Sequence, residues 1–192
     1  MVRTLSPEKR ENLLRSALTL FVANGVQNTS TAEIAKEAGI AAGTLFIYFP
    51  TKQDLIHELV LSIGKGQSDN INSLLNPSLS VRETFFTIWN GSISWFMENM
   101  EAFKFFQQVR DSGMIDQAVV QESSKFFIFY YEAIQKGLQE SQIKSYPIDL
   151  IGGFLYQDIV ALMNYIIGMQ DTARQEELIK LGFEIFWDGI KL

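Results

Sequence analysis

The hydrophobic positions of this chain recur at helical spacing along nearly its whole length. The first apolar stripe is formed by Leu13, Leu14, Ala17, Leu18 and Phe21. Ser6 and Pro7 suit the N-cap and first position of its helix, and Asn24-Gly25 ends it. The alternation of apolar and polar residues that is typical of strands is rare. The pattern therefore predicts an all-α fold.

Two short helices joined by a tight turn are predicted between Ser30 and Phe49. Ser30 and Glu33 have the spacing of a capping box at the start of the first helix. Gly39 stands at the turn, where a positive φ favours glycine. Leu45 lies on the same face of the second helix as Phe49 and is the expected plug of the shared core. This is the pattern of a helix-turn-helix, whose second helix enters the DNA major groove, although an ordinary helical hairpin also fits it.

The rest of the chain continues the helical pattern. Pro50 ends the second motif helix, and Thr51 can cap a longer helix that runs to about Ser73. Five more helices are predicted over residues 80–99, 102–111, 116–140, 147–170 and 173–190, about nine in total. The predicted organisation is a three-helix DNA-binding domain over residues 1–50, followed by a helical bundle over residues 51–192 that binds a ligand and dimerises.

Composition narrows the function classes. The 192 residues include no cysteine, which excludes a disulfide framework, a thiolate zinc site and a cysteine nucleophile. The net charge is −6, but the first 60 residues carry six basic and six acidic side chains. DNA binding would therefore depend on individually placed groups rather than on a basic block.

Neither a signal peptide nor a membrane span is predicted. The N-terminus has no apolar run followed by small residues. The most apolar stretch, Ile148–Met169, is interrupted by four polar residues, namely Asp149, Gln157, Asp158 and Asn164. We expect a buried helix there and a cytoplasmic protein.

An enzyme is the main alternative from another class. His57 is the only histidine, it lies on a predicted amphipathic helix, and no serine or cysteine nucleophile is placed beside it by the sequence. Neither a glycine-rich loop after a strand nor a cluster with metal-ligand spacing is present. We therefore expect no catalytic residues, no cofactor and no metal site. A helical interaction module without DNA binding is a third possibility.

Aromatic side chains are concentrated in the predicted bundle. Core packing accounts for many of them, but together they can also line an apolar pocket between helices, where bundle proteins bind small molecules. The residues predicted to line such a pocket are Trp89, Ile93, Phe96, Phe106, Phe127, Tyr131 and Tyr156.

The last two predicted helices are apolar on nearly every side, so each needs partners on more than one face. The helix over 147–170 also has a stripe of small or polar residues that permits close packing: Gly153, Gln157, Ala161, Asn164 and Gly168. We expect these two helices to form a four-helix interface in a two-fold homodimer. The alternative is that both are central helices of a monomer.

The segments LLRSALTLF, TSTAEIAKEAGI, AAGTLFIYF and TKQDL, with Gly25 between the first two, lie within Leu13–Val60. Together they resemble the N-terminal module of the TetR family of bacterial and archaeal repressors. The resemblance implies a dimer that binds a pseudo-palindromic double-stranded DNA operator and responds to a small molecule. An apolar or aromatic effector would fit the predicted pocket, and whether it releases or promotes DNA binding stays open.

The resemblance also implies which residues contact DNA. These are Thr31 and Lys52 at phosphates, Ala42, Gly43 and Thr44 at the start of the recognition helix, and Phe46 and Tyr48 at the backbone. Ala41 stands where the family usually has a capping serine, and Phe46 where tyrosine is common. Ala42 and Gly43 have no side-chain hydrogen-bonding group. Base readout is therefore expected to rest on Thr44 and on apolar contacts with thymine methyl groups.

Overall fold

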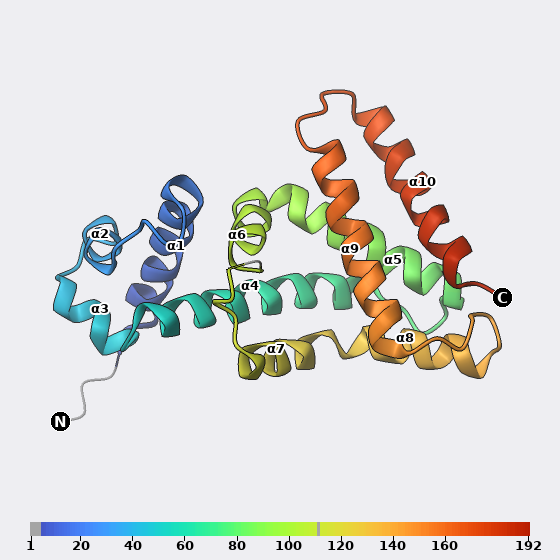
Figure 1. The fold of residues 1–192 in the computed structure, drawn as a ribbon, viewed down its shortest axis with the longest axis horizontal. Coiled ribbons are helices and arrows are strands. Elements are labelled where there is room, and N and C mark those ends of the chain that lie inside the picture. Colours follow the sequence, from blue (N-terminus) through green and yellow to red (C-terminus); the bar gives the residue numbers. More distant parts are fainter. Residues whose placement is uncertain (1–4, 111) are drawn as a thin grey trace. The chain divides into compact units, whose positions relative to one another are not determined.

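The computed structural model describes residues 5–110 and 112–192, and their regular elements are helices (Figure 1). The α-helices are α1 (Pro7–Asn24), α2 (Thr31–Glu37), α3 (Ala42–Tyr48), α4 (Lys52–Leu74), α5 (Val81–Glu98), α6 (Met100–Arg110), α7 (Gln117–Ser124), α8 (Ile128–Gln139), α9 (Ile148–Ile166) and α10 (Thr172–Ile190). This part of the chain contains no strand and only one isolated bridge, between Ile143 and Lys191. The all-α prediction is confirmed. The predicted helix end at Asp111 lies outside the described residues.

The helices form two compact units. The first comprises the chain up to Gly66 together with Asn99–Lys125, and the second comprises Gln67–Glu98 together with Phe126–Leu192. Helices α1, α2, α3, α6 and α7 belong to the first unit, and α5, α8, α9 and α10 belong to the second. Helix α4 contains residues of both. Among the described residues, no helix combines the length and apolar content that a membrane crossing requires.

The core of the first unit is made by α1, α2, α3 and α6. Leu13 and Phe21 of α1, Ile34 of α2 and Leu45 of α3 are fully buried. The ring of Phe21 stacks on that of Phe105 from α6, with centroids 5.9 Å apart. Burying one such side chain contributes about 1.5–3 kcal/mol relative to leaving it exposed. The apolar stripe of α1 thus supplies the core that α2 and α3 cannot make alone.

The core of the second unit is built around Trp89 of α5. Its indole N–H donates to the carbonyl of Ile179 on α10 at 2.9 Å, and its ring stacks on Phe186. A Cβ atom at Gly182 would lie 2.9 Å from Trp89 Cζ2 and 3.0 Å from Leu162 Cδ2. A residue without a side chain is needed there for α10 to pack this closely.

The prediction of one continuous helix over residues 116–140 is wrong. The segment divides into α7, a 3₁₀ turn (Lys125–Phe127) and α8. The hydroxyls of Ser123 and Ser124 donate to backbone carbonyls three residues earlier, at 3.0 and 2.8 Å. The hydroxyl of Ser68 donates to the carbonyl of Phe126. Such side-chain bonds compete with the helical ladder and favour a break at this point.

Candidate functional site

Helix α2 begins with the predicted capping box. The hydroxyl of Ser30 accepts from the backbone N–H of Glu33 at 3.2 Å, and the carboxylate of Glu33 accepts from the backbone N–H of Ser30 at 2.7 Å. The Ser30 hydroxyl also donates to this carboxylate. The backbone bond first, and the hydroxyl bond second, hold the pKa of Glu33 below its usual value. Both side chains of the box therefore accept hydrogen bonds from backbone N–H groups that have no partner within the helix.

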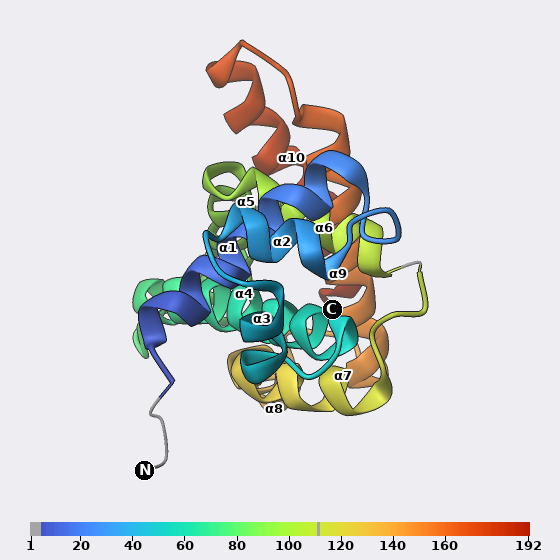
Figure 2. The ribbon, with the colours of Figure 1, turned by 90° about the vertical axis from the view of Figure 1, so that its left-hand side faces the viewer.

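The turn between α2 and α3 has the predicted geometry. Gly39 has φ = 70°, a backbone conformation that favours glycine. Ala35 is almost fully buried where the two helices approach, and Leu45 fills the core between them. The structure thus confirms a helix-turn-helix arrangement, which Figure 2 shows with α2 and α3 one above the other.

Helix α3 has no capping side chain, because Ala41 stands at its N-cap. Leu45 and Phe49 are buried beneath the helix. The outward residues pair at a spacing of four, Ala42 with Phe46 and Gly43 with Ile47, and all four are exposed. We call these four residues the outer face of α3. Ile47, which is 58% exposed, is absent from the sequence-based site, although its spacing from Gly43 could have indicated it.

The hydroxyl of Tyr48 ties the end of α3 to the start of α1. Its oxygen accepts from the backbone N–H of Ser6 at 3.0 Å. Because the oxygen acts as acceptor here, the hydroxyl hydrogen remains available for another acceptor such as a phosphate oxygen. Thr31, the first residue of α2, and Thr44 of α3 are both half-buried.

Lys52 makes contacts within the first unit that the sequence did not indicate. Its ammonium donates to the carbonyl of Val26 at 2.5 Å, lies 3.5 Å from that of Gln27, and sits 5.8 Å from the ring centroid of Phe21. Partial burial lowers the pKa of Lys52. The N–H of Val26 donates to the side chain of Gln108 on α6 at 3.1 Å. Val26 therefore links the start of α4 to α6.

His57 is half-buried. Its Nε2 lies 3.2 Å from the carbonyl of Met114 and 3.7 Å from the carboxylate of Asp116. Within the described residues, no group of three or more His, Cys, Asp or Glu side chains is arranged to hold a metal ion.

The residues predicted to line an effector pocket occupy different environments. Phe106 lies on α6 in the first unit, and the other six lie in the second. Trp89, Ile93 and Phe96 are buried on α5. Phe127 packs against the rings of Phe129 and Tyr130, each with a centroid separation of 5.9 Å, while Tyr131 is 53% exposed. Tyr156, on α9, is half-buried.

A polar pair lies among these aromatic side chains in the second unit. The hydroxyls of Ser92 on α5 and Tyr130 on α8 are 3.3 Å apart. Burial of the phenol raises the pKa of Tyr130 to about 12, with a smaller contribution in the same direction from Tyr156. The predicted set omits both Ser92 and Tyr130. One serine among apolar residues gives no signal in the sequence, and Tyr130 could not be separated from its aromatic neighbours.

Helices α9 and α10 pair with each other (Figure 1). Both helices leave large apolar side chains exposed. Ile185 of α10 is 75% exposed, and the other large exposed side chains of these two helices are Leu150, Phe154, Tyr165 and Leu181. Leu181 and Ile185 are four residues apart, as are Leu150 and Phe154, so each pair shares one face of its helix.

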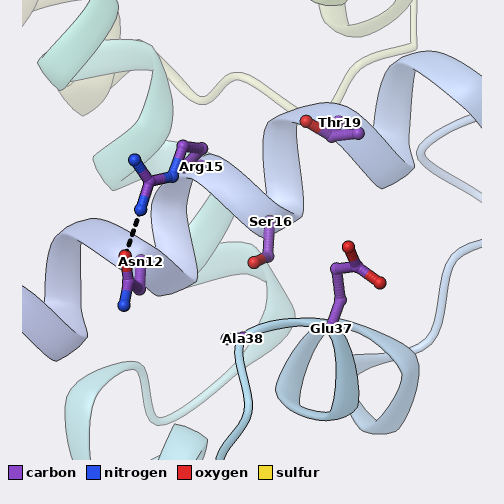
Figure 3. Close-up of a pocket in the computed structure, with 6 residues that line it drawn as sticks. All are labelled: Asn12, Arg15, Ser16, Thr19, Glu37 and Ala38. Atoms are coloured by element: carbon purple, nitrogen blue, oxygen red, sulfur yellow. Dashed lines mark hydrogen bonds between the residues drawn. The ribbon is translucent and has the colours of Figure 1, made fainter.

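A polar hollow of about 330 Å³ lies between α1 and α2 (Figure 3). Its lining consists of Asn12, Arg15, Ser16, Thr19, Glu37 and Ala38. The guanidinium of Arg15 is hydrogen-bonded to Asn12 within the hollow. These side chains do not include any of the predicted effector-pocket residues, and their polarity does not suit an apolar molecule.

A helix-turn-helix with an uncovered second helix, followed by a larger helical unit, defines a DNA-binding transcriptional regulator. Residues 13–59 match the family model described as bacterial regulatory proteins of the tetR family, and residues 63–192 match the tetracyclin repressor-like C-terminal domain. The chain belongs to the TetR family. Members of this family are not enzymes, and they are generally ligand-responsive repressors that typically act as dimers.

Individual relatives resemble the chain over most of its length. The HTH-type transcriptional regulator SrpR of Pseudomonas putida is 21% identical over 94% of this chain and 84% of its own. AcrR of Shigella flexneri is 27% identical over 86% of this chain and 78% of its own. The crystal structure of a tetR family regulator from Shewanella sp. PV-4 matches with a TM-score of 0.90 and 29% identity, covering 96% of this chain and 98% of that one.

Proposed function

We propose that this protein is a repressor that binds a pseudo-palindromic operator as a homodimer and is released by a small apolar or aromatic molecule. Residues 1–50 are proposed to bind DNA, and residues 51–192 to hold the effector and form the dimer, in the cytoplasm. The observation that carries the proposal is the exposed outer face of α3 in a helix-turn-helix whose opposite side is fully packed. Such a face is free to enter the major groove.

The proposed DNA contacts combine the outer face of α3 with groups around it. They are the predicted residues Thr31, Ala42, Gly43, Thr44, Phe46, Tyr48 and Lys52, together with Ile47. Tyr48 supports this role because its hydroxyl hydrogen is free while its oxygen is held by Ser6. Lys52 has three N–H donors, and the carbonyls of Val26 and Gln27 take at most two of them, which leaves one for a phosphate.

The DNA-binding proposal is tested by gel shifts of the full-length protein on DNA from upstream of its own gene, at two salt concentrations. We expect sequence-selective binding that weakens as salt rises. Ala42→Glu places a carboxylate on the outer face of α3 and should abolish binding. Ala23→Glu is the matched control, since Ala23 is exposed on α1 and should tolerate the change. No selective binding at low salt would contradict the proposal.

The dimer is proposed to form through α9 and α10. The exposed apolar side chains on both helices support this, because pairing them with their copies across a two-fold axis buries all of them at once. Sedimentation of Ile185→Asp should show monomers. Ile128→Asp changes an exposed isoleucine on α8 and should remain dimeric. A dimer that withstands Ile185→Asp would place the interface elsewhere.

The effector site is proposed to lie in the second unit, where the Ser92–Tyr130 pair provides a polar group among aromatic side chains. Pockets of this kind use a few polar groups to orient a mostly apolar ligand. The lining is proposed to include the predicted residues that lie in this unit, namely Trp89, Ile93, Phe96, Phe127, Tyr131 and Tyr156.

Mass spectrometry of solvent extracts from the purified protein tests this site. Tyr130→Phe should reduce the amount of any co-purified molecule, while Tyr146→Phe, on an exposed side chain, should not. Equal amounts of the same molecule in both variants would show that Tyr130 does not hold it.

A further inference from the structure

We infer that the outer face of α3 recognises the methyl groups of thymine bases, so that operator half-sites are selected for thymine at the contacted positions. This inference rests on the proposed DNA-binding function and names the base chemistry that the same site recognises. It concerns Ala42, Gly43, Phe46 and Ile47.

The outer face of α3 has no side-chain hydrogen-bonding group. All four of its residues are apolar or glycine, and the whole helix, AGTLFIY, carries no charged side chain. In the major groove, bases present hydrogen-bond donors and acceptors, which this face cannot match. The thymine C5-methyl group is the feature of that groove that an apolar side chain can contact favourably.

Gly43 is not explained by packing inside the protein. Its φ does not lie in the region that favours glycine, and no described atom lies within 4 Å of the Cβ that a larger residue would carry. Glycine inside a helix is less favourable than alanine. An absent side chain on an outward position instead lets another molecule approach the helix backbone closely. On the outer face of the second helix of a helix-turn-helix, that molecule is DNA.

Phe46 and Ile47 are the large side chains that flank this opening. They are 47% and 58% exposed, whereas Leu45, on the opposite face of the helix, is fully buried. Two large apolar groups held in water on a rigid helix gain from any contact that removes them from it. Continuity with the helix-turn-helix surface identifies the base edges as the occupant rather than another protein.

The inference is tested with thymine replaced by uracil, which removes the methyl group and leaves base pairing unchanged. The full-length protein is first used to select bound duplexes from a random pool. Each thymine in the region of the selected duplex that the bound protein protects from nuclease is then replaced in turn. Loss of one buried methyl group should weaken binding about fourfold. Uracil placed outside the protected region should have no effect.

Protein variants test whether α3 is responsible for the discrimination between thymine and uracil. Ile47→Ala should weaken binding to the thymine operator by a similar factor and should lose its discrimination between thymine and uracil at one position of each half-site. Ile47→Val should keep most of that discrimination. Ile128→Ala, an exposed isoleucine on α8, is the control and should leave binding unchanged. Equal thermal unfolding of the variants would show that they are folded.

The possible results separate this inference from the function on which it rests. Selection of a sequence that binds equally well with uracil at every position would overturn the methyl recognition and leave the DNA-binding function intact. A pool with no enriched sequence would overturn the DNA-binding function and this inference with it.

Discussion

Helices α2 and α3 each have seven residues and together form the helix-turn-helix, yet only α2 adds capping side chains to the core contacts that both helices make. Helix α2 has a complete capping box at its start and Lys36 in its last turn. Helix α3 has Ala41 at its N-cap and no charged residue. It depends instead on Leu45 and Phe49 in the core. The supporting helix is thus stabilised by its own ends in addition to the buried Ile34 and Ala35, whereas the reading helix depends on its tertiary contacts alone and keeps its outer face free.

The largest test of this contrast is Leu45→Ala. Because α3 has no local stabilisation, removing its fully buried anchor should lower the free energy of unfolding by about 2–5 kcal/mol. Urea unfolding measures this, with Phe46→Ala on the exposed side of the same helix as control. A loss below about 1 kcal/mol, which is less than a core cavity costs, would mean that Leu45 is not what holds α3.

A smaller effect is expected from Ser30→Ala, which removes the cap of α2. Loss of a capping side chain costs about 1 kcal/mol. Ser62→Ala, at an exposed position within α4, should be close to neutral in the same urea titration. If the two serine variants unfold alike, the capping box does not stabilise α2.

The reverse change is Ala41→Ser at the start of α3. The backbone of Ala41 has φ = −67° and ψ = 141°, an extended conformation like that of Ser30. A serine hydroxyl there should accept from an N–H group in the first turn of α3 and raise the free energy of unfolding by about 0.5–1 kcal/mol. The midpoint of thermal unfolding should rise. An unchanged midpoint would show that a serine at position 41 does not stabilise α3.

The smallest effect is a pH dependence specific to α2. Hydrogen bonds from Ser30 lower the folded-state pKa of Glu33. The carboxylate therefore adds to the free energy of unfolding above the unfolded-state pKa, and this addition is lost as the pH falls through the folded-state pKa. The stability difference between the natural protein and Glu33→Gln should therefore shrink on acidification. Helix α3 has no carboxylate and contributes no such term. A difference that is constant from neutral to acidic pH would contradict the assignment.

Local signals explain why much of the first unit was predictable from sequence. The capping box of α2, Gly39 at the turn and the burial of Leu45 all follow from residues within a few positions of one another. The bonds from Ser6 to Tyr48, from Val26 to Gln108 and from Lys52 to Val26 join distant positions. No local pattern encodes such pairs, so the internal partners of Lys52 could not be foreseen.

The aromatic residues that follow residue 125 show a second limit on what the sequence alone can predict. Successive residues of a helix point in directions about 100° apart, so neighbours of the same type have different environments. Phe129 is buried, Tyr130 carries the hydroxyl that meets Ser92, and Tyr131 is exposed. Their order in the sequence does not state which is which, because the break at the 3₁₀ turn sets the rotation of α8.

The close approach at Gly182 has a consequence for how this protein and its relatives diverge. The indole of Trp89 is held by the carbonyl of Ile179 at one edge and by the bare backbone of Gly182 at another. A lineage that replaces Gly182 must therefore shrink Trp89 or Leu162 in the same period of its evolution. Residues 89, 162 and 182 should covary among relatives. At the proposed effector site, new preferences would then be expected at positions such as 92 and 130, which are not among the nearest neighbours of Gly182.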